Sequence, residues 1–579
     1  MIGVPLRFKT AVALVLLGLL TLLAGIGQKT IWAPSETFTA SAPADAAAAP
    51  LTVIDQKLRT LHGGTVEIDI KGEGNFLLAA GRPDDVAAWV GKTAHNSVTG
   101  VSEDNKSLQV ERTDGEATAP SPAGSDLWVS TENASGELKY NWTPPADGDW
   151  SLLLASDGTK PAPSSISMTF PNDTATPWAI PLMVIGGLLM LAGIALLVLK
   201  NGHRNGKAGG GMGSLFARRA RAKAAAKAGS SARLSMIVAA ATAAVVAGTG
   251  AAAHAATSPA PAPSTGTSST ASPSGSSTAT AKTAADSPVL LDAQFRRILE
   301  QVSSATDSGD AAKDAGKLSA RVGGTELEVR TKNYKIRSQV GSYEARMPVR
   351  STKLLTTVVT SKRAFPRSVL AVTQGEGNVV PQLLTLVQAS PRANYKLVET
   401  TPLQPGTTFP AIGRDGTETL AADDKSGLLY SGTEALAGLA DRLTKADSSF
   451  KDKLVEGDSS PYIADTLSYQ ADVVKSGVNG NFAFTHKVVP GSSVVFRTAD
   501  GGALVLGRLT FGFDGTPKAD GDKLAIGNDA AVLAGGKETT TGMVLSFAES
   551  MAVYIPPAGS KDPMKLVAAT RGLVGASFK

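Results

Sequence analysis

Three apolar runs divide the sequence, and the third places the strongest constraint on how the chain folds. Residues 232–263 ("ARLSMIVAAATAAVVAGTGAAAHAATSPAPAP") have the order of a secretory signal: basic residues, an apolar run and an Ala-x-Ala pattern at 253–255. Such signals belong at the start of a chain, whereas this one begins more than 230 residues along it. We therefore predict that residues 234–253 are a transmembrane helix or internal signal that exports the C-terminal part of the chain. Cleavage after Ala255 is the alternative.

The first two apolar runs are long enough to cross a bilayer, which takes about 20 residues. Residues 11–27 are Leu-rich and uncharged, and no obvious Ala-x-Ala site follows them, so we predict an uncleaved helix rather than a signal peptide. Residues 178–199 form an uninterrupted apolar run that predicts a second transmembrane helix. Within it, Gly186, Gly187 and Gly193 would allow another helix to approach closely.

The distribution of charge indicates the orientation of these helices. Residues 1–10 carry Arg7 and Lys9 without an acid, and residues 200–233 carry nine Lys or Arg without an acid. Because loops rich in Lys and Arg stay in the cytoplasm, we predict that both segments are cytoplasmic and that residues 30–176 are exported. The basic loop is expected to contact the bilayer and its anionic lipids rather than nucleic acid.

A low-complexity segment comes after the third run. Residues 257–288 consist mainly of Pro, Ser, Thr, Gly and Ala, which bury no core, so we predict an extended, disordered tether. Such a tether would let the last part of the chain stand away from the membrane. The predicted fold class is a multi-domain, multi-pass protein of the cell membrane, with three transmembrane helices and both large domains outside the cytoplasm.

The first exported segment, residues 30–176, has the pattern of an all-β domain. It is acidic, with 20 Asp or Glu against 9 Lys or Arg. Alternating apolar and polar residues predict short strands, and Pro83 followed by two acids predicts one helix at 83–90. About seven strands at this spacing favour a β-sandwich or jelly roll. The predicted strands are 65–72, 76–81, 107–113, 126–131, 137–142, 150–156 and 165–170.

One stretch of this domain resembles known secreted modules. Residues 140–156 ("YNWTPPADGDWSLLLAS") are similar to the penultimate hairpin of many bacterial β-sandwich modules, which implies a fold and no ligand. Trp128, Trp142 and Trp150 have two interpretations, a platform for stacking sugar rings or buried core aromatics, and the second is favoured. No Asp-x-Asp-x-Asp-Gly loop is present here, so we expect a hydrated acidic surface.

The C-terminal part is predicted to contain two repeated α+β units, residues 289–430 and 431–579. In each unit helical stretches precede several strand-like segments. Short matches between the units recur in the same order, which indicates a tandem duplication. The matched pairs are 368–374 with 503–509, 382–390 with 543–550, and 391–403 with 562–573.

Helices followed by long antiparallel strands resemble the cystatin/NTF2-like α+β cone, in which helices pack into a curved sheet. The whole chain also resembles uncharacterised multi-pass envelope proteins of high-GC actinobacteria, through its Ala/Gly-rich, cysteine-free composition and this order of helices and domains. These resemblances imply attachment to the cell surface and no particular activity, because such cones serve both enzymes and binding modules.

The sequence contains no recognisable catalytic, cofactor-binding or metal-binding motif. Without cysteine, disulfides, thiolate metal sites and thiol catalysis are excluded. The histidines form no His-x-x-x-His or His-Glu-x-x-His pattern, and no Gly-x-Ser-x-Gly elbow occurs, so we predict no catalytic residue, no metal and no cofactor. The five histidines are His62, His95, His203, His254 and His486.

Two groups of residues keep a functional alternative. His486 alternates with Phe482 and Phe484 and shares their strand face, so it is either a core histidine, which is favoured, or part of a cavity lining. The run Asp514, Asp520 and Asp522, in a predicted loop between strands, is either a calcium site or, as favoured, a hydrated hairpin loop. Asp423 and Asp424 form the other notable acidic group.

These observations favour a non-enzymatic, membrane-anchored envelope protein whose exported domains bind cell-wall polymer, a lipid-linked or peptide ligand, or other envelope proteins. One alternative is an accessory subunit of an envelope assembly or export machine. The other is an unrecognised hydrolase or isomerase that uses an NTF2-like pocket in a C-terminal unit, where His486 would meet a carboxylate.

Overall fold

The computed structural model describes residues 6–61, 63–144, 148–198, 287–413, 415–457, 459 and 461–579. The predicted third helix (234–253), the basic loop (200–233) and all but the last two residues of the predicted tether lie outside the described residues. The described chain belongs to two compact units. One contains a pair of apolar helices, and the other contains residues 33–175 together with the C-terminal region.

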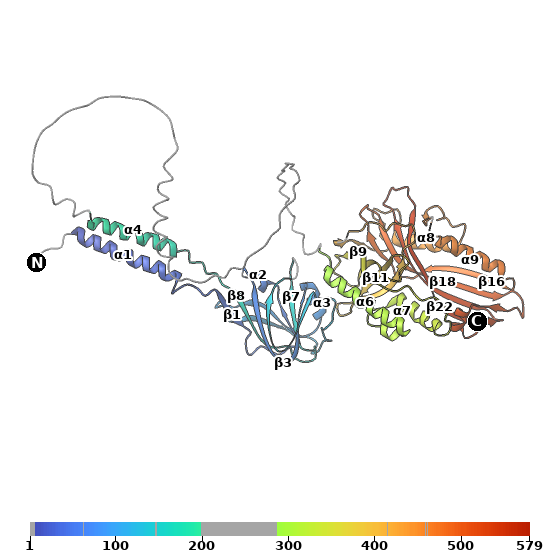
Figure 1. The fold of residues 1–579 in the computed structure, drawn as a ribbon, viewed down its shortest axis with the longest axis horizontal. Coiled ribbons are helices and arrows are strands. Elements are labelled where there is room, and N and C mark those ends of the chain that lie inside the picture. The colour runs from blue at the N-terminus through green and yellow to red at the C-terminus, as the bar shows by residue number, and fades with distance from the viewer. Residues whose placement is uncertain are drawn as a thin grey trace, which may run out of the picture. The chain divides into compact units, whose positions relative to one another are not determined.

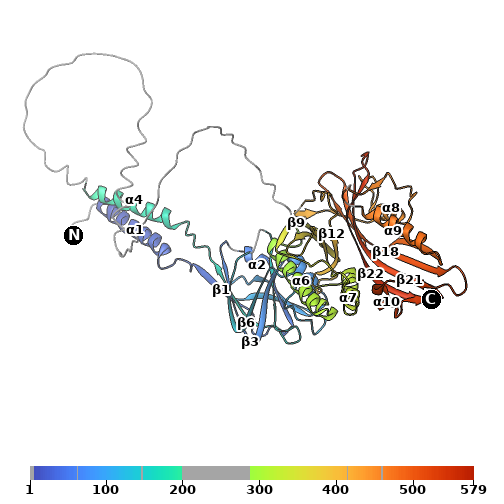
Figure 2. The ribbon, with the colours of Figure 1, turned by 45° about the vertical axis from the view of Figure 1, so that its right-hand side comes forward.

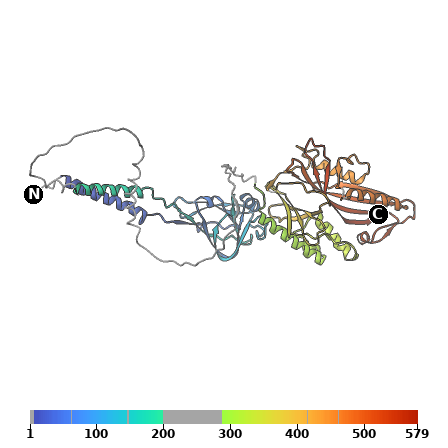
Figure 3. The ribbon, with the colours of Figure 1, turned by 45° about the horizontal axis from the view of Figure 1, so that its top comes forward.

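The apolar unit contains two helices that are long and apolar enough to cross a membrane, α1 (Leu6–Lys29) and α4 (Ala179–Val198). They lie side by side (Figures 1–3). A Cβ atom built on Gly186 would lie 2.5 Å from the nitrogen of Leu22, and one on Gly193 would lie 2.6 Å from Val15 Cγ2. Gly187, by contrast, has no neighbouring atom within 4 Å. Two of the three glycines therefore bring the backbones together, as in helix pairs that associate within lipid.

Residues 33–175 form one eight-stranded mixed sheet that curls around a core. The strand order is β1-β8-β3-β7-β2-β4-β5, and β6 pairs with β3. Ser41 at the end of β1 bridges to Ser107 just before β5, so the two edges meet and the fold is sandwich- or barrel-like. The elements are β1 (Thr37–Ser41), β2 (Leu51–Ile54), α2 (Lys57–Thr60), β3 (Val66–Gly81), α3 (Pro83–Val90), β4 (His95–Val101), β5 (Leu108–Thr113), β6 (Ser130–Trp142), β7 (Ser151–Ala155) and β8 (Ser165–Pro171).

Most local predictions for this domain are confirmed, but the strand predicted at 126–131 is wrong for 126–129, which form a turn before β6 begins at Ser130. The helix predicted at 83–90 is α3. The segments predicted as two strands, 65–72 and 76–81, form the single strand β3, because its pairing with β6 resumes after a bulge between Lys71 and Asn75. Strands β1, β2 and β4 were not predicted, since they are short or lack a clean alternation of apolar and polar residues.

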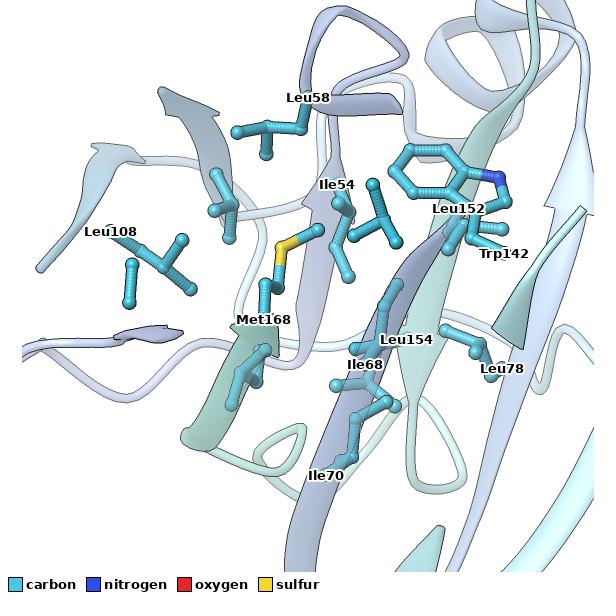
Figure 4. Close-up of a cluster of buried hydrophobic side chains, with 14 of the residues drawn as sticks. Ile54, Leu58, Ile68, Ile70, Leu78, Leu108, Trp142, Leu152, Leu154 and Met168 are labelled. Atoms are coloured by element: carbon cyan, nitrogen blue, oxygen red, sulfur yellow. The ribbon is translucent and has the colours of Figure 1, made fainter. Parts of the chain in front are cut away.

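The side chains on the inner face of this sheet make a continuous apolar core (Figure 4). Ile68 and Ile70 of β3 point into it with Trp142 of β6. Trp128, Trp142 and Trp150 are 1%, 1% and 3% exposed. All three tryptophans are therefore buried, and they offer no exposed platform for a sugar ring.

The C-terminal region contains two larger sheets, each with helices on one face. The first has the order β12-β11-β10-β9-β13, and the second has the order β14-β17-β18-β21-β22-β15, with β16 paired to β18. The first group of elements is α6 (Asp292–Ala312), η3 (Ala315–Leu318), α7 (Gly324–Arg337), β9 (Lys353–Thr360), β10 (Arg367–Gln374), β11 (Gln382–Gln388), β12 (Lys396–Pro402) and β13 (Asp415–Thr417). The second is β14 (Thr419–Leu420), α8 (Gly432–Thr444), β15 (Leu454–Val455), α9 (Tyr462–Ser476), β16 (Gly480–Val488), β17 (Val494–Arg497), β18 (Ala503–Pro517), β19 (Leu524–Ala525), α10 (Asn528–Ala534), β20 (Glu538–Thr539), β21 (Met543–Ile555) and β22 (Met564–Phe578).

Both sheets are built on an antiparallel meander of four strands. In the first sheet these are β9, β10, β11 and β12, and in the second β17, β18, β21 and β22. The three matched pairs of sequence segments fall on β10 with β18, β11 with β21, and β12 with β22, which hold equivalent positions in the two meanders. This arrangement supports a duplication, which itself stays a prediction.

The two meanders pack against each other. Val358, Leu370 and Leu383 of the first sheet meet Phe496 and Leu504 of the second in one apolar cluster. The opposite face of the first sheet packs against α6, and that of the second packs against α8 and α9. The result is a four-layer arrangement of helix, sheet, sheet and helix.

Buried ion pairs join the sandwich-like domain to the C-terminal region within one compact unit. Arg367 Nη1 lies 2.7 Å from Asp85 Oδ1, with side chains 1% and 2% exposed. Arg321 Nη1 lies 2.6 Å from Asp126 Oδ2. Arg392 donates hydrogen bonds to two carbonyl oxygens of α3. The C-terminal region therefore contacts the first domain directly through these buried groups.

We predict that Arg367→Met lowers the free energy of unfolding of this unit by about 3–5 kcal/mol, because it leaves the Asp85 carboxylate buried without its partner. The double variant Asp85→Leu with Arg367→Met is expected to lie close to the wild type, because no buried charge then remains unpaired. Urea unfolding of the detergent-solubilised chain, followed by tryptophan fluorescence, measures both. A double variant less stable than either single variant would contradict this account.

Candidate functional site

The space between the two packed sheets opens at one end into a cavity of about 430 Å³, a size typical of sites for small ligands. The cavity is bounded by the β9–β10 hairpin, β11, β12 and the start of α7 on one side, and by β14, the β16–β17 loop and β18 on the other. It therefore lies entirely within the C-terminal region.

The cavity exists because the inward side chains change from apolar to polar along the strands. On β11 the residues facing the second sheet are Leu383, which lies in the apolar cluster, and then Thr385, which lines the cavity. On β18 the corresponding pair is Leu504 in the cluster and Arg508 at the cavity. The two sheets are in contact where both present aliphatic side chains. They are separated by the cavity where the facing side chains are polar.

A β-bulge in β12 turns an acidic side chain into this cavity. Leu386 pairs with Leu397, and both pack against the helices, but the next pair is Thr385 with Glu399, so Val398 is the extra residue. Without the bulge, Glu399 would share the helix-side face of Leu397. With it, Glu399 shares the face of Thr385 and lines the cavity. Bulges of this kind commonly re-aim side chains at functional sites.

Glu399 is buried without a partner in the part of the chain that the structure describes. It is 7% exposed, and among the described residues its carboxyl group makes no hydrogen bond or ion pair. Burial raises its pKa from the ordinary 4.5 to about 8, although the charge of Arg508 acts in the opposite direction. At neutral pH this side chain is therefore mostly a neutral carboxylic acid, able to donate as well as accept a hydrogen bond.

Other polar atoms of the cavity lining also lack partners among the residues that the structure describes. They are Thr385 Oγ1, Thr419 Oγ1 and Arg508 Nε, all buried. Buried polar atoms in proteins are nearly always hydrogen-bonded, so a group of unpaired ones around one cavity is unusual. A polar molecule bound between the sheets would give Glu399 the hydrogen-bond partner that it lacks in the described chain.

Residues 286–577 match the family described as a domain of unknown function (DUF8094). The chain belongs to this family. No curated protein and no solved structure matches the chain. The DUF8094 region thus contains both sheets and the whole cavity, whereas the sandwich-like domain and the apolar helices precede it.

The start of α7 is fixed beside the DUF8094 cavity by a buried ionic network. Arg330 is fully buried and pairs with Glu326 and with Asp310. Glu326 also accepts a hydrogen bond of 2.8 Å from Thr400 on β12, the neighbour of Glu399. Burial alone would raise the pKa of Glu326, but Arg330, Arg346 and these hydrogen bonds lower it, so Glu326 is ionised and fully paired. It contrasts with the unpaired Glu399.

His486, one of the residues with two interpretations, lies in a second buried network of the DUF8094 region. Its Nδ1 is 2.8 Å from Glu549 Oε2, and both side chains are 0% exposed. Its Nε2 is 3.2 Å from Gln470, and its ring stacks on Phe511 at 4.5 Å. Burial opposes ionisation of Glu549, but its pKa is lowered by His486 and Arg571. His486 is thus a fully satisfied core histidine, away from the cavity lining.

Three of the five acidic residues singled out in the sequence have local partners. Asp514 lies within β18 rather than in the predicted loop and pairs with Lys579 at 2.7 Å. Asp522 accepts a hydrogen bond from the Ala519 nitrogen, and Asp424 accepts one from the Ser426 nitrogen. In the described ranges no group of three or more His, Asp or Glu is arranged to hold a metal ion.

The amino-acid sequence alone predicts neither the cavity nor the role of Glu399 in its lining. The available signal was an acid inside the apolar strand "KLVETTP" at 396–402. Simple alternation would have placed Glu399 on the same face as Leu397. Its true direction depends on the bulge, which pairing with β11 imposes.

We predict that Glu399 makes this protein less stable as pH rises. Between its ordinary pKa of 4.5 and its folded value of about 8, the unfolded chain releases the proton while the folded chain retains it, so folding is progressively disfavoured. Between about pH 5.5 and pH 7.5 this contribution approaches about 2.7 kcal/mol. Urea unfolding at both pH values should show a smaller pH dependence for Glu399→Gln than for the wild type. Equal dependence in the two proteins would mean that Glu399 ionises normally.

Proposed function

We propose that this protein is a non-enzymatic, membrane-anchored envelope protein whose DUF8094 region binds a small ligand in the cavity between its two sheets. The observation that carries the proposal is Glu399, a buried acid without a partner among the described residues, which a bulge directs into a cavity of ligand size. In each half of the region helices pack on one face of an antiparallel meander, as in the cystatin/NTF2-like cones that the sequence resembles, and such folds host both enzymes and binding modules.

The anchor in this proposal is the helix pair α1 and α4. These helices flank the sandwich-like domain in sequence, so if both cross the bilayer, the chain after α4 emerges on the side opposite to that domain. The DUF8094 region nevertheless pairs with the domain through Arg367–Asp85 and Arg321–Asp126. If both parts share one side, the chain crosses the bilayer a third time between α4 and α6, and we propose the apolar run at 234–253 for this crossing. The buried ion pairs support this proposal.

Reporter fusions test this topology. A reporter active only outside the cytoplasm is expected to work when fused at residue 100 or residue 450, and a reporter active only in the cytoplasm is expected to work at residue 220, because the basic loop stays inside. Fusions at 100 and 450 that report opposite sides would contradict both the third crossing and the buried ion pairs.

Filling the cavity tests the binding function. Ser368 lines the cavity and Ser546 is an exposed serine on β21, so Ser368→Phe and Ser546→Phe form a matched pair. Full-length protein is extracted in mild detergent, and the small molecules released on denaturation are identified by mass spectrometry. We expect a compound that accompanies the wild type and Ser546→Phe and is lost in Ser368→Phe. A compound pattern unchanged by Ser368→Phe would contradict binding at this site.

A second candidate function has one specific observation in its favour. A carboxyl group with a pKa of about 8 is suited to general acid or base catalysis near neutral pH. Catalysis would also need a second reacting group, and the residue expected for that role, His486, is held by Glu549 and Gln470 instead. For this reason binding is the proposal that the geometry favours. If the wild type converts the co-purified compound and Glu399→Gln does not, the result would support the enzyme instead.

A further inference from the structure

The cavity of the DUF8094 region has two kinds of lining. One is aliphatic and comes from both sheets and the loops between them; it includes Val387, Val398, Leu420, Val494, Val495 and Leu506. Among the described residues, no aromatic side chain lines the cavity. Such walls suit an aliphatic body, because burial of each CH₂ contributes about 0.8 kcal/mol, and they lack the ring surfaces on which sugars stack.

The other kind of lining is polar and predominantly positive. Lys362 lies at the exposed β9–β10 hairpin, and Arg508 projects from β18 with its Nε unpaired within the described chain. Gly324 and Thr325, the first residues of α7, also line the cavity. The first N–H groups of a helix have no intrahelical acceptor and favour an anion. Of the lining residues that the structure describes, Glu399 is the only acid, and it is neutral while protonated.

We propose that the cavity binds a small organic anion, with its acid head between Arg508, the start of α7 and Glu399, and its aliphatic body against the valine and leucine walls. This proposal rests on the proposed binding function and names its ligand class. Arg508 pairs with Glu328 through Nη2 at 2.5 Å, and its guanidinium places positive charge at the cavity. Thr385 and Thr419 belong to the same polar part of the lining.

Binding of an anion is expected to depend on the proton at Glu399. The charged groups near this side chain are Arg508 from β18, Glu326 from α7, and Lys362 and Arg367 from the β9–β10 hairpin. Arg367 and Glu326 are committed to buried partners, so Glu399 remains the group whose charge changes near neutral pH. Protonated, it donates a hydrogen bond to the acid head. Ionised above its pKa of about 8, it repels the head, and affinity falls.

Calorimetric titration of the full-length, detergent-solubilised protein with hexanoate tests the ligand class. Hexan-1-ol and hexylamine serve as probes of equal length with neutral and positive heads. Heat measured with Ser368→Phe, whose cavity is filled, is subtracted to remove partition into detergent. We expect hexanoate to bind more tightly than the other two at about pH 6.5 and roughly tenfold more weakly at about pH 9, where most Glu399 is ionised.

Two variants assign the effect to residues. Glu399→Gln keeps a hydrogen-bond donor that does not titrate, so hexanoate should bind it equally at both pH values. Arg508→Gln should weaken hexanoate binding, whereas Arg497→Gln, at a half-buried arginine of β17 outside the cavity, should not.

The outcomes separate the ligand class from the site itself. Tighter binding of hexylamine or hexan-1-ol than hexanoate, abolished by Ser368→Phe, would overturn the anion proposal and leave the binding function standing. A pH dependence retained in Glu399→Gln would also overturn it. If no probe distinguishes wild type from Ser368→Phe and no compound co-purifies with the wild type, both the ligand class and the binding function fail.

Discussion

The apolar contact between the two sheets of the DUF8094 region is the interaction on which the cavity depends. Leu370 and Leu383 on one side and Phe496 and Leu504 on the other bury each other over part of the interface, and the hydrophobic effect holds the sheets together there. Because both sheets are stiffened by helices on their outer faces, they do not collapse where the facing residues become polar. The cavity is therefore a consequence of where the apolar pattern ends.

A β-bulge in β12 then places an acidic side chain in the cavity lining. The bulge at Val398 places Leu397 in the helix-side core and Glu399 on the opposite face. Two acids that lie near each other differ in their surroundings. Glu326 is buried with two arginines, whereas Glu399 is buried without an ion-pair partner in the described chain. A buried acid without a partner lowers the stability of the fold. The proposed binding role is a physical reason for the presence of Glu399.

The buried ion pairs between the sandwich-like domain and the DUF8094 region extend this argument to the whole chain. An ion pair such as Arg367–Asp85 holds its geometry only while both partners are excluded from water together. It therefore orients the cavity-bearing region relative to the first domain, and Arg367 contributes to both the interface and the cavity lining. The close glycine contacts of α1 and α4 play a comparable role in the apolar unit, since they allow two backbones to touch.

The sequence by itself determined the features that depend on local pattern. The apolar runs at 11–27 and 178–199 predicted the helices α1 and α4, Pro83 and its acids predicted α3, and alternating residues predicted most strands of the first domain. These features depend on length, periodicity and capping, which neighbouring residues carry among themselves. Only the tertiary structure decided the direction of Glu399 and the pairing of Arg367 with Asp85. A strand's register is fixed by its partner, and a buried charge is matched by residues far away in the chain, so neither has a local signal.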